Sequence, residues 1–265
     1  MPIDLAPHNA YGLILTAPVM TAAGCFGFGV EYARFGMIEQ LGAIVTRPVT
    51  LNGRRRHPPQ LIETPAGLLR DGNGSAVGLA TVLERYAPIW AAWQTPVIVH
   101  VAADHVAVAA ALEGVEGIAG IELTVTADAI AAAALIARVR AVTLLPLLAK
   151  LPLHEALPAT ARAVHEAGAD ALVLCSSPRG MAYDPVSGQP IEGWISGPAL
   201  RPFVLQAVAD TAARLGVPLV ACGGVTTSAT ARAYLRAGAT AVQIGSALFA
   251  DPLAAARIAS EASSG

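Results

Sequence analysis

The sequence contains a single lysine, Lys150, beside 16 arginines. Lys150 ends a short apolar run, Leu145–Lys150, which has the length of a β-strand. An ammonium group is a compact charge with rotatable donors, so it can stabilise an anionic ring or form a Schiff base where a guanidinium does not fit. The alternative is a surface lysine without a role, in a composition biased towards arginine and alanine.

Two later apolar runs end in glycines that could bind an anion. Gly223-Gly224 follows the run that ends at Cys222, and Gly245-Ser246 follows the next run. Glycines let backbone N–H groups approach a phosphate closely, helped by the positive N-terminus of a following helix. The pattern predicts a phosphate site. The alternative is that these glycines only permit tight turns.

The elements that must position these groups alternate regularly along the chain. Strands are predicted at Val19–Ala22, Ala43–Thr46, Val97–Val101, Gly120–Thr124, Leu145–Lys150, Ala171–Leu174, Val217–Cys222 and Ala241–Ile244. Helices are predicted at Glu31–Gln40, Leu79–Trp93, Asp104–Leu112, Asp128–Arg140, Glu155–Ala167, Pro198–Leu215, Ser228–Ala237 and Pro252–Ala259. Eight such units in about 250 residues predict an α/β protein with one (β/α)8 TIM barrel domain over residues 1–265. A doubly wound open sheet is the alternative, but no GxGxxG turn follows the first strand.

Two connections are longer than ordinary turns and follow strand ends at which barrel enzymes build their sites. The first runs from Arg47 to Val77 and carries Arg70 and the triplet Arg54–Arg56, and the second runs from Cys175 to Gly197. Their length predicts lids or binding walls. For the triplet, a solvated loop is the alternative.

Composition excludes several classes of protein. The chain is 54% hydrophobic and 14% charged with a net charge of −2, which excludes disorder and gives no basic field for nucleic acid. No apolar run approaches the ~20 residues that span a membrane. Three cysteines make no disulfide framework, and the N-terminus shows no signal peptide, so we expect a cytoplasmic location. No Cys/His spacing indicates zinc or an iron–sulfur cluster, so no metal is expected.

Several motifs together resemble the soluble, class 1 dihydroorotate dehydrogenases, collinearly from about residue 13 to 252. They are Pro18–Gly27, Gly42–Thr50, Glu63–Gly67, Ser196–Ala199, Gly223–Thr226 and Ala237–Ser246. The resemblance implies an FMN-binding barrel that transfers hydride from a CH–CH group to the flavin in pyrimidine metabolism. It places the flavin ring against Ala22, Ala23 and Gly24, with Lys150 at its edge. Ser196 and Gly197 would flank the ring, and Gly223, Gly224, Gly245 and Ser246 would hold the phosphate.

The sequence departs from this family on the substrate side. The family's Glu-Leu-Asn-x-Ser-Cys-Pro-Asn pattern, whose cysteine is the general base, is Glu122-Leu-Thr-Val-Thr-Ala-Asp128 here. Thr124 stands for the first asparagine and Ala127 for the cysteine, and the loop that follows is missing. Arg70 replaces another asparagine, Ser176-Ser177 replaces Asn-Thr, and Arg47 replaces a lysine. The predicted substrate contacts are therefore Arg47, Arg70, Thr124, Ser176 and Ser177.

Loss of paired hydrogen-bonding groups and of a positioned base lowers activity towards the original substrate steeply. An altered, anionic small-molecule substrate is predicted, because guanidinium groups bind carboxylates in a bidentate manner. Cys175, His100 and Tyr183 are candidates for a replacement proton acceptor. For His100 a core or rim histidine is the alternative, for Cys175 a small buried hydrophobe, and Tyr183 would otherwise only pack its loop.

Three functions remain open at this point. The first is an FMN-dependent oxidoreductase with a rebuilt substrate site, in which Lys150, Cys175 and His100 are the catalytic candidates. The second is a non-catalytic paralogue that binds FMN or another phosphate ligand. The third is a lyase that forms a Schiff base at Lys150. The resemblance also implies that the barrel can form a homodimer.

Overall fold

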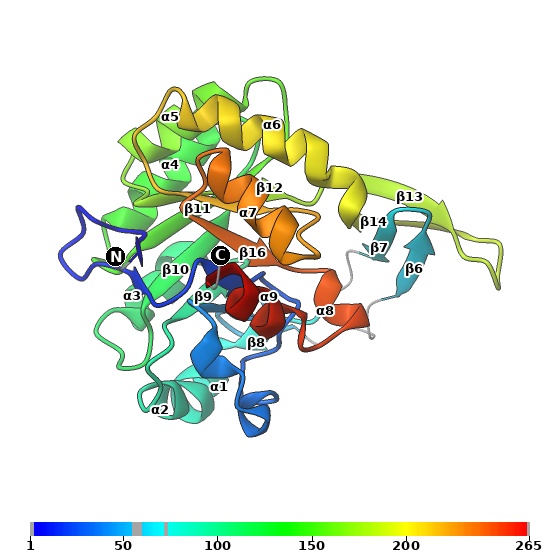
Figure 1. The fold of residues 1–265 in the computed structure, drawn as a ribbon. Coiled ribbons are helices and arrows are strands. Elements are labelled where there is room, and N and C mark those ends of the chain that lie inside the picture. The colour runs from blue at the N-terminus through cyan, green and yellow to red at the C-terminus, as the bar shows by residue number, and fades with distance from the viewer. Residues whose placement is uncertain (1–2, 55–59, 72–73, 264–265) are drawn as a thin grey trace.

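The computed structural model describes residues 3–54, 60–71 and 74–263 (Figure 1). Arg55 and Arg56 of the arginine triplet lie outside the described residues, and Arg54 lies within them.

Eight parallel strands of the described chain form a closed ring, which confirms the predicted TIM barrel. They are β3 (Val19–Thr21), β4 (Ile44–Val45), β9 (Val97–Val101), β10 (Gly120–Thr124), β11 (Leu147–Pro152), β12 (Ala171–Ser176), β15 (Leu219–Cys222) and β16 (Ala241–Ile244). Neighbouring strands pair in the order β3-β16-β15-β12-β11-β10-β9, and β4 pairs with β9. A parallel bridge between Met20 and Ala43 closes the ring between β3 and β4.

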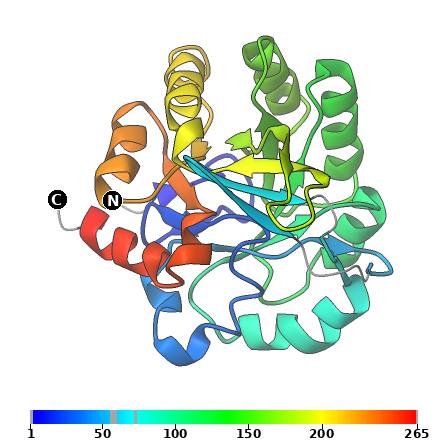
Figure 2. The same cartoon turned by 90° about the vertical axis from the view of Figure 1, so that its right-hand side faces the viewer.

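Helices surround this ring, as Figure 2 shows along the barrel axis. They are α1 (Leu79–Thr81), α2 (Ala87–Trp90), α3 (His105–Leu112), α4 (Ala129–Arg140), α5 (Leu157–Glu166), α6 (Arg201–Ala212), α7 (Ser228–Arg236), α8 (Ala247–Ala250) and α9 (Ala254–Ser263). Except for α8, which was not predicted, they overlap the predicted helices, with two further differences in detail. The predicted helix Glu31–Gln40 is two 3-10 turns, Ala33–Phe35 and Ile38–Gln40, because Gly36 between them is left-handed at φ 64°. A π-helical stretch, Val82–Tyr86, joins α1 to α2, where Pro88 lacks the N–H of a regular α-helix.

The apolar core has two parts, and the alternation of side chains along the strands separates them. One part fills the barrel interior and includes Met20, Ile98, Leu148 and Val220. The other lies between the strands and the surrounding helices. A short hairpin of β1 (Ile3–Asp4) and β2 (Ile14–Leu15) contributes to the interior part.

The two long connections fold into strands of their own, which the sequence analysis did not predict. They supply β6 (Leu61–Thr64), β7 (Gly67–Asp71), β13 (Arg179–Tyr183) and β14 (Pro190–Ser196), which form an antiparallel sheet in the order β13-β14-β7-β6. We call this the cap sheet, because it lies across the mouth of the barrel in Figure 2. The first connection also supplies β5 (Val49–Thr50) and β8 (Val77–Gly78), which extend the barrel sheet beside β9.

None of the helices in the described ranges combines the length and the apolar character needed to cross a membrane.

Candidate active site

A polar layer lies above the apolar interior of the barrel, towards the carboxyl ends of the strands. His100 is two residues beyond the interior residue Ile98, and Lys150 is two residues beyond Leu148. Because alternate residues of a strand face the same side, both side chains point into the barrel. Glu122 lies opposite His100 in the strand register, and Gln243 follows the interior residue Ala241 by two positions.

These four side chains form one hydrogen-bonded network. His100 Nδ1 lies 3.1 Å from Glu122 Oε1, and Lys150 Nζ lies 3.5 Å from the same oxygen. Lys150 also donates to Gln243 Oε1 at 2.8 Å, and Gln243 Nε2 donates to Glu122 Oε2 at 2.6 Å. Each member is buried, so the proposal that Lys150 is a chance surface lysine is wrong.

The network fixes an ion pair in the interior. Burial alone would raise the pKa of Glu122, but Lys150, His100 and Gln243 hold it at about 2. Burial opposes the charge of Lys150, yet the neighbouring Cys222 and Glu122 raise the pKa of its ammonium above the ordinary value. Glu122 is therefore a carboxylate and Lys150 an ammonium at neutral pH.

Three cysteines lie around this ion pair as protonated thiols. Burial raises the pKa of Cys25 to about 11 and that of Cys175 to about 12. Burial also raises the pKa of Cys222, although Lys150 beside it acts in the opposite sense. The structure therefore does not support Cys175 as a proton acceptor at neutral pH, and favours its interpretation as a small buried side chain.

The predicted phosphate residues meet at the ends of β15 and β16. Gly224 has a left-handed φ of 66°, and a Cβ there would lie 3.0 Å from the carbonyl oxygen of Gly197. A Cβ at Gly245 would lie 3.4 Å from Ala22 Cβ. The backbone N–H groups of Gly224, Val225, Gly245 and Ser246 make no hydrogen bond to another described residue. They offer free donors where glycine leaves the backbone uncovered, which suits an anion.

The remaining predicted cofactor residues lie beside this corner. Gly24 follows Ala22 and Ala23 at the end of β3, and its carbonyl oxygen accepts a hydrogen bond of 3.4 Å from Arg70 Nη1. Ser196 is the last residue of β14, and Gly197, which follows it, packs against Gly67 of the cap sheet. The structure thus gathers these residues at one end of the barrel.

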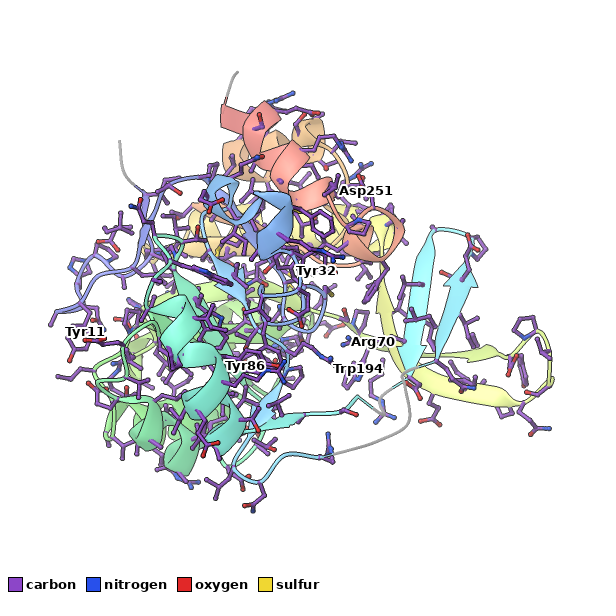
Figure 3. The ribbon with its side chains drawn as sticks, turned by 90° about the horizontal axis from the view of Figure 1, so that it is seen from below. Tyr11, Tyr32, Arg70, Tyr86, Trp194 and Asp251 are labelled. Atoms are coloured by element: carbon purple, nitrogen blue, oxygen red, sulfur yellow. The ribbon has the colours of Figure 1, made fainter. Side chains whose placement is uncertain are left out.

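A cavity of about 450 Å³ opens between the barrel mouth and the cap sheet. Arg70 lies opposite Trp194 in the register of β7 and β14, and opposite Leu61 in that of β7 and β6. All three residues of this row line the cavity, and Figure 3 shows Arg70 and Trp194 between the barrel and the projecting strands.

Two further arginines, Arg47 and Arg54, line the same cavity. None of the three cavity arginines forms an ion pair with another described residue. Glu31 and Asp71 also line the cavity, but their carboxylates accept hydrogen bonds from the backbone N–H groups of Phe28 and Gln60. The cavity lining therefore carries three arginines and two carboxylates, and the arginines form no ion pair within the described residues.

The structure separates the predicted substrate residues into two groups. Arg47 and Arg70 line the cavity, whereas Thr124, Ser176 and Ser177 are not among its lining residues. Thr124 is exposed at the end of β10, and Ser176 is the last residue of β12. Tyr183, at the end of β13, is also exposed and lies outside the cavity lining.

The chain enters α4 directly after β10, as the sequence predicts. Asp128 caps that helix, because its Oδ1 accepts a hydrogen bond of 2.9 Å from the N–H of Ala131. Ala127 is exposed, and its carbonyl oxygen accepts a hydrogen bond from Thr160. The segment between β10 and α4 thus presents no side chain that could act as a base at Ala127.

Sequence reasoning missed Glu122, Gln243 and Trp194 as parts of the site, and it left Arg54 open between the substrate side and a solvated loop. The first two could have been found from strand alternation, because they share the inward face with Lys150. Trp194 could not, because its place depends on the pairing of two distant connections. Within the described ranges, no group of three or more His, Cys, Asp or Glu side chains is arranged to hold a metal ion.

Comparisons with known proteins indicate the same family as the fold and the motifs. The family model described as dihydroorotate dehydrogenase matches residues 6–264. The chain is 36% identical over 272 residues to the "Dihydroorotate dehydrogenase B (NAD(+)), catalytic subunit" of Citrifermentans bemidjiense, covering 94% of this chain and 89% of that protein. It is 34% identical over 263 residues to the protein of the same name from Geobacillus kaustophilus, covering 91% and 84%. The chain belongs to the dihydroorotate dehydrogenase family.

Proposed function

We propose that this chain is an FMN-dependent oxidoreductase that accepts hydride from a CH–CH group of an anionic small molecule. The observation that carries the proposal is the placement of three features at one end of the barrel. They are the glycine corner with its free N–H groups, the buried Lys150, and the arginine-bordered cavity.

The residues of the corner fit FMN. Gly223, Gly224, Gly245 and Ser246 would hold its phosphate through backbone N–H groups, because a side chain at Gly224 would meet Gly197 and Arg201. Ala22, Ala23 and Gly24 would lie against the isoalloxazine ring, with Lys150 at its edge and Ser196 and Gly197 beside it. FMN supplies the capacity to accept a hydride, and the protein supplies position and electrostatics. The fixed charge of Lys150 would stabilise negative charge on the ring.

The substrate side supports an anionic ligand. Arg70 stands where the family has an asparagine and Arg47 where it has a lysine, and both line the cavity. A guanidinium binds a carboxylate through two parallel hydrogen bonds, and unpaired arginines at a cavity wall favour such a ligand. Thr124, Ser176 and Ser177 would contact the substrate at the strand ends, and His100 remains a catalytic candidate.

A first test is reconstitution of the purified protein with FMN. We expect a yellow protein that binds one FMN per chain, and a colourless protein that takes up no FMN would overturn the proposal.

Dihydroorotate should leave the bound FMN essentially unreduced. Losing a positioned base lowers a rate by about 10²–10⁴-fold, and losing paired polar contacts lowers discrimination by about 10⁴-fold. Anaerobic stopped-flow absorbance of the FMN-loaded protein measures this, with dithionite as the positive control for reduction. Rapid bleaching by dihydroorotate would show that the substrate side has not been altered.

A second candidate is a protein that binds FMN without catalysis. The absence of a base at Ala127 favours it. To separate the two candidates, the FMN-loaded protein is photoreduced and then mixed with each of a panel of unsaturated carboxylates. If the protein is an enzyme, at least one carboxylate should reoxidise its bound FMN faster than it reoxidises free reduced FMN.

The geometry does not favour the lyase that was considered from the sequence. A Schiff base needs a neutral amine, and Lys150 is held as an ammonium by Glu122 and Gln243. Borohydride with a 2-oxo acid should therefore leave the mass of the Lys150 peptide unchanged. A covalent adduct on that peptide would restore the lyase hypothesis.

The relatives are named as catalytic subunits, and we extend this to the chain as the proposal that it acts with at least one further subunit. A homodimer and a cytoplasmic location remain predictions.

A further inference from the structure

His100 is the member of the buried network with a free hydrogen-bonding atom. Its Nδ1 is occupied by Glu122 Oε1 at 3.1 Å, whereas its Nε2 makes no hydrogen bond to another described residue. Among the described residues, only Nε2 of His154 is both fully buried and without a partner. Nε2 of His100 is therefore not fully buried.

A shared carboxylate oxygen, Glu122 Oε1, places His100 beside Lys150, which the proposed function sets at the edge of the flavin ring. His100 lies opposite Glu122, and Lys150 lies one inward-facing layer nearer the carboxyl ends, opposite Thr124. The backbone N–H of His100 donates to Thr46 Oγ1 at 3.1 Å, which fixes the strand at this point. The imidazole and the ammonium thus flank one carboxylate below the mouth of the barrel.

Lys150 carries a fixed charge and not a variable one. Its ammonium contacts Gln243, Glu122 and Cys222. An imidazole is the side chain that ordinarily changes charge between pH 5 and 8. The charged or titratable groups that face His100 are Glu122, Lys150 and His105 on α3.

We propose that His100 binds a proton at Nε2 when FMN in this site is reduced. The inference rests on the proposed function. A hydride from the substrate would bring two electrons and one proton, and thus one negative charge, to bound FMN. A second proton passes from solvent to Nε2, and Glu122 stabilises the resulting imidazolium through Nδ1–H. Two electrons and two protons then enter the site, and its net charge is unchanged.

The test is a spectroelectrochemical titration of the FMN-loaded protein between pH 6 and 8, with the wild type compared with His100→Gln. For two protons per two electrons, the reduction equilibrium falls about a hundredfold per pH unit, and for one proton about tenfold. The tenfold difference corresponds to about 30 mV per pH unit in a two-electron couple. We expect the steeper dependence in the wild type and the shallower one in His100→Gln.

The matched control is His165→Gln, which changes a histidine on α5 outside the network and should keep the steeper slope. His100→Asn serves as a second variant if His100→Gln fails to fold. An equal slope in the wild type and in a folded His100 variant would overturn this inference while leaving the proposed function intact. A wild-type chain that binds no FMN would overturn the proposed function, and this inference with it.

Discussion

Replacing Glu122 by glutamine should lower the free energy of unfolding by about 3–5 kcal/mol, since this is the usual effect of removing one partner of a buried ion pair. The variant leaves the ammonium of Lys150 buried without a counter-charge, and it places new N–H donors where His100, Lys150 and Gln243 already donate. Urea unfolding followed by circular dichroism measures the loss.

The control for this variant is the pair Glu122→Gln with Lys150→Met. Removing both charges should recover roughly half of the loss or more, because a buried pair can be replaced by uncharged groups at small net effect. Losses that simply add in the double variant would show that the two charges do not stabilise each other.

The same carboxylate predicts a pH dependence. The pKa of Glu122 in the folded chain is about 2, below its ordinary value of 4.5, so its stabilising contribution is present above pH 4.5. That contribution is lost as the pH falls from 4.5 towards 2, because the unfolded state then binds the proton first. Glu122→Gln should lack this part of the acid-induced loss of stability.

Replacing Gly224 by alanine should weaken FMN binding by about tenfold to a hundredfold. Gly224 is left-handed at φ 66°, and a Cβ there would lie 3.0 Å from both the Gly197 carbonyl oxygen and Arg201 Cβ. A non-glycine residue in such a conformation costs about 1–3 kcal/mol of backbone strain. If the turn moves to relieve this strain, it displaces the N–H groups proposed to hold the phosphate and weakens binding. Quenching of FMN fluorescence on titration gives the dissociation constant.

Gly216→Ala is the matched substitution, because a Cβ at Gly216 meets open space and its φ lies outside the left-handed region. Its dissociation constant for FMN should equal that of the wild type. Equal constants for the Gly224 and Gly216 variants would argue against the glycine corner as the phosphate site.

The barrel and its glycine corner could be predicted because they depend on local signals. Each strand is a short apolar run, and the glycines at 223, 224 and 245 mark strand ends directly in the sequence. The inward position of Lys150 likewise follows from the alternation of one strand.

The cap sheet could not be predicted, because it depends on pairing between residues far apart in sequence. Arg70 and Trp194 face each other across β7 and β14, and neither connection shows a regular apolar alternation. Arginine in a long loop is ambiguous on its own, since it is usually solvated there. The family resemblance assigned Arg70 and Arg47 to the substrate side, and the pairing of the strands shows which residues accompany Arg70 along the cavity.

The cap sheet has a consequence for how specificity in this scaffold can change. Its row of cavity residues is assembled from two separate insertions, and the barrel strands beneath contribute none of the three members of that row. Replacing only one insertion in a related barrel would introduce two strands of the cap sheet without the strands that pair with them. The two insertions should therefore be exchanged together when a substrate preference is moved from one barrel to another.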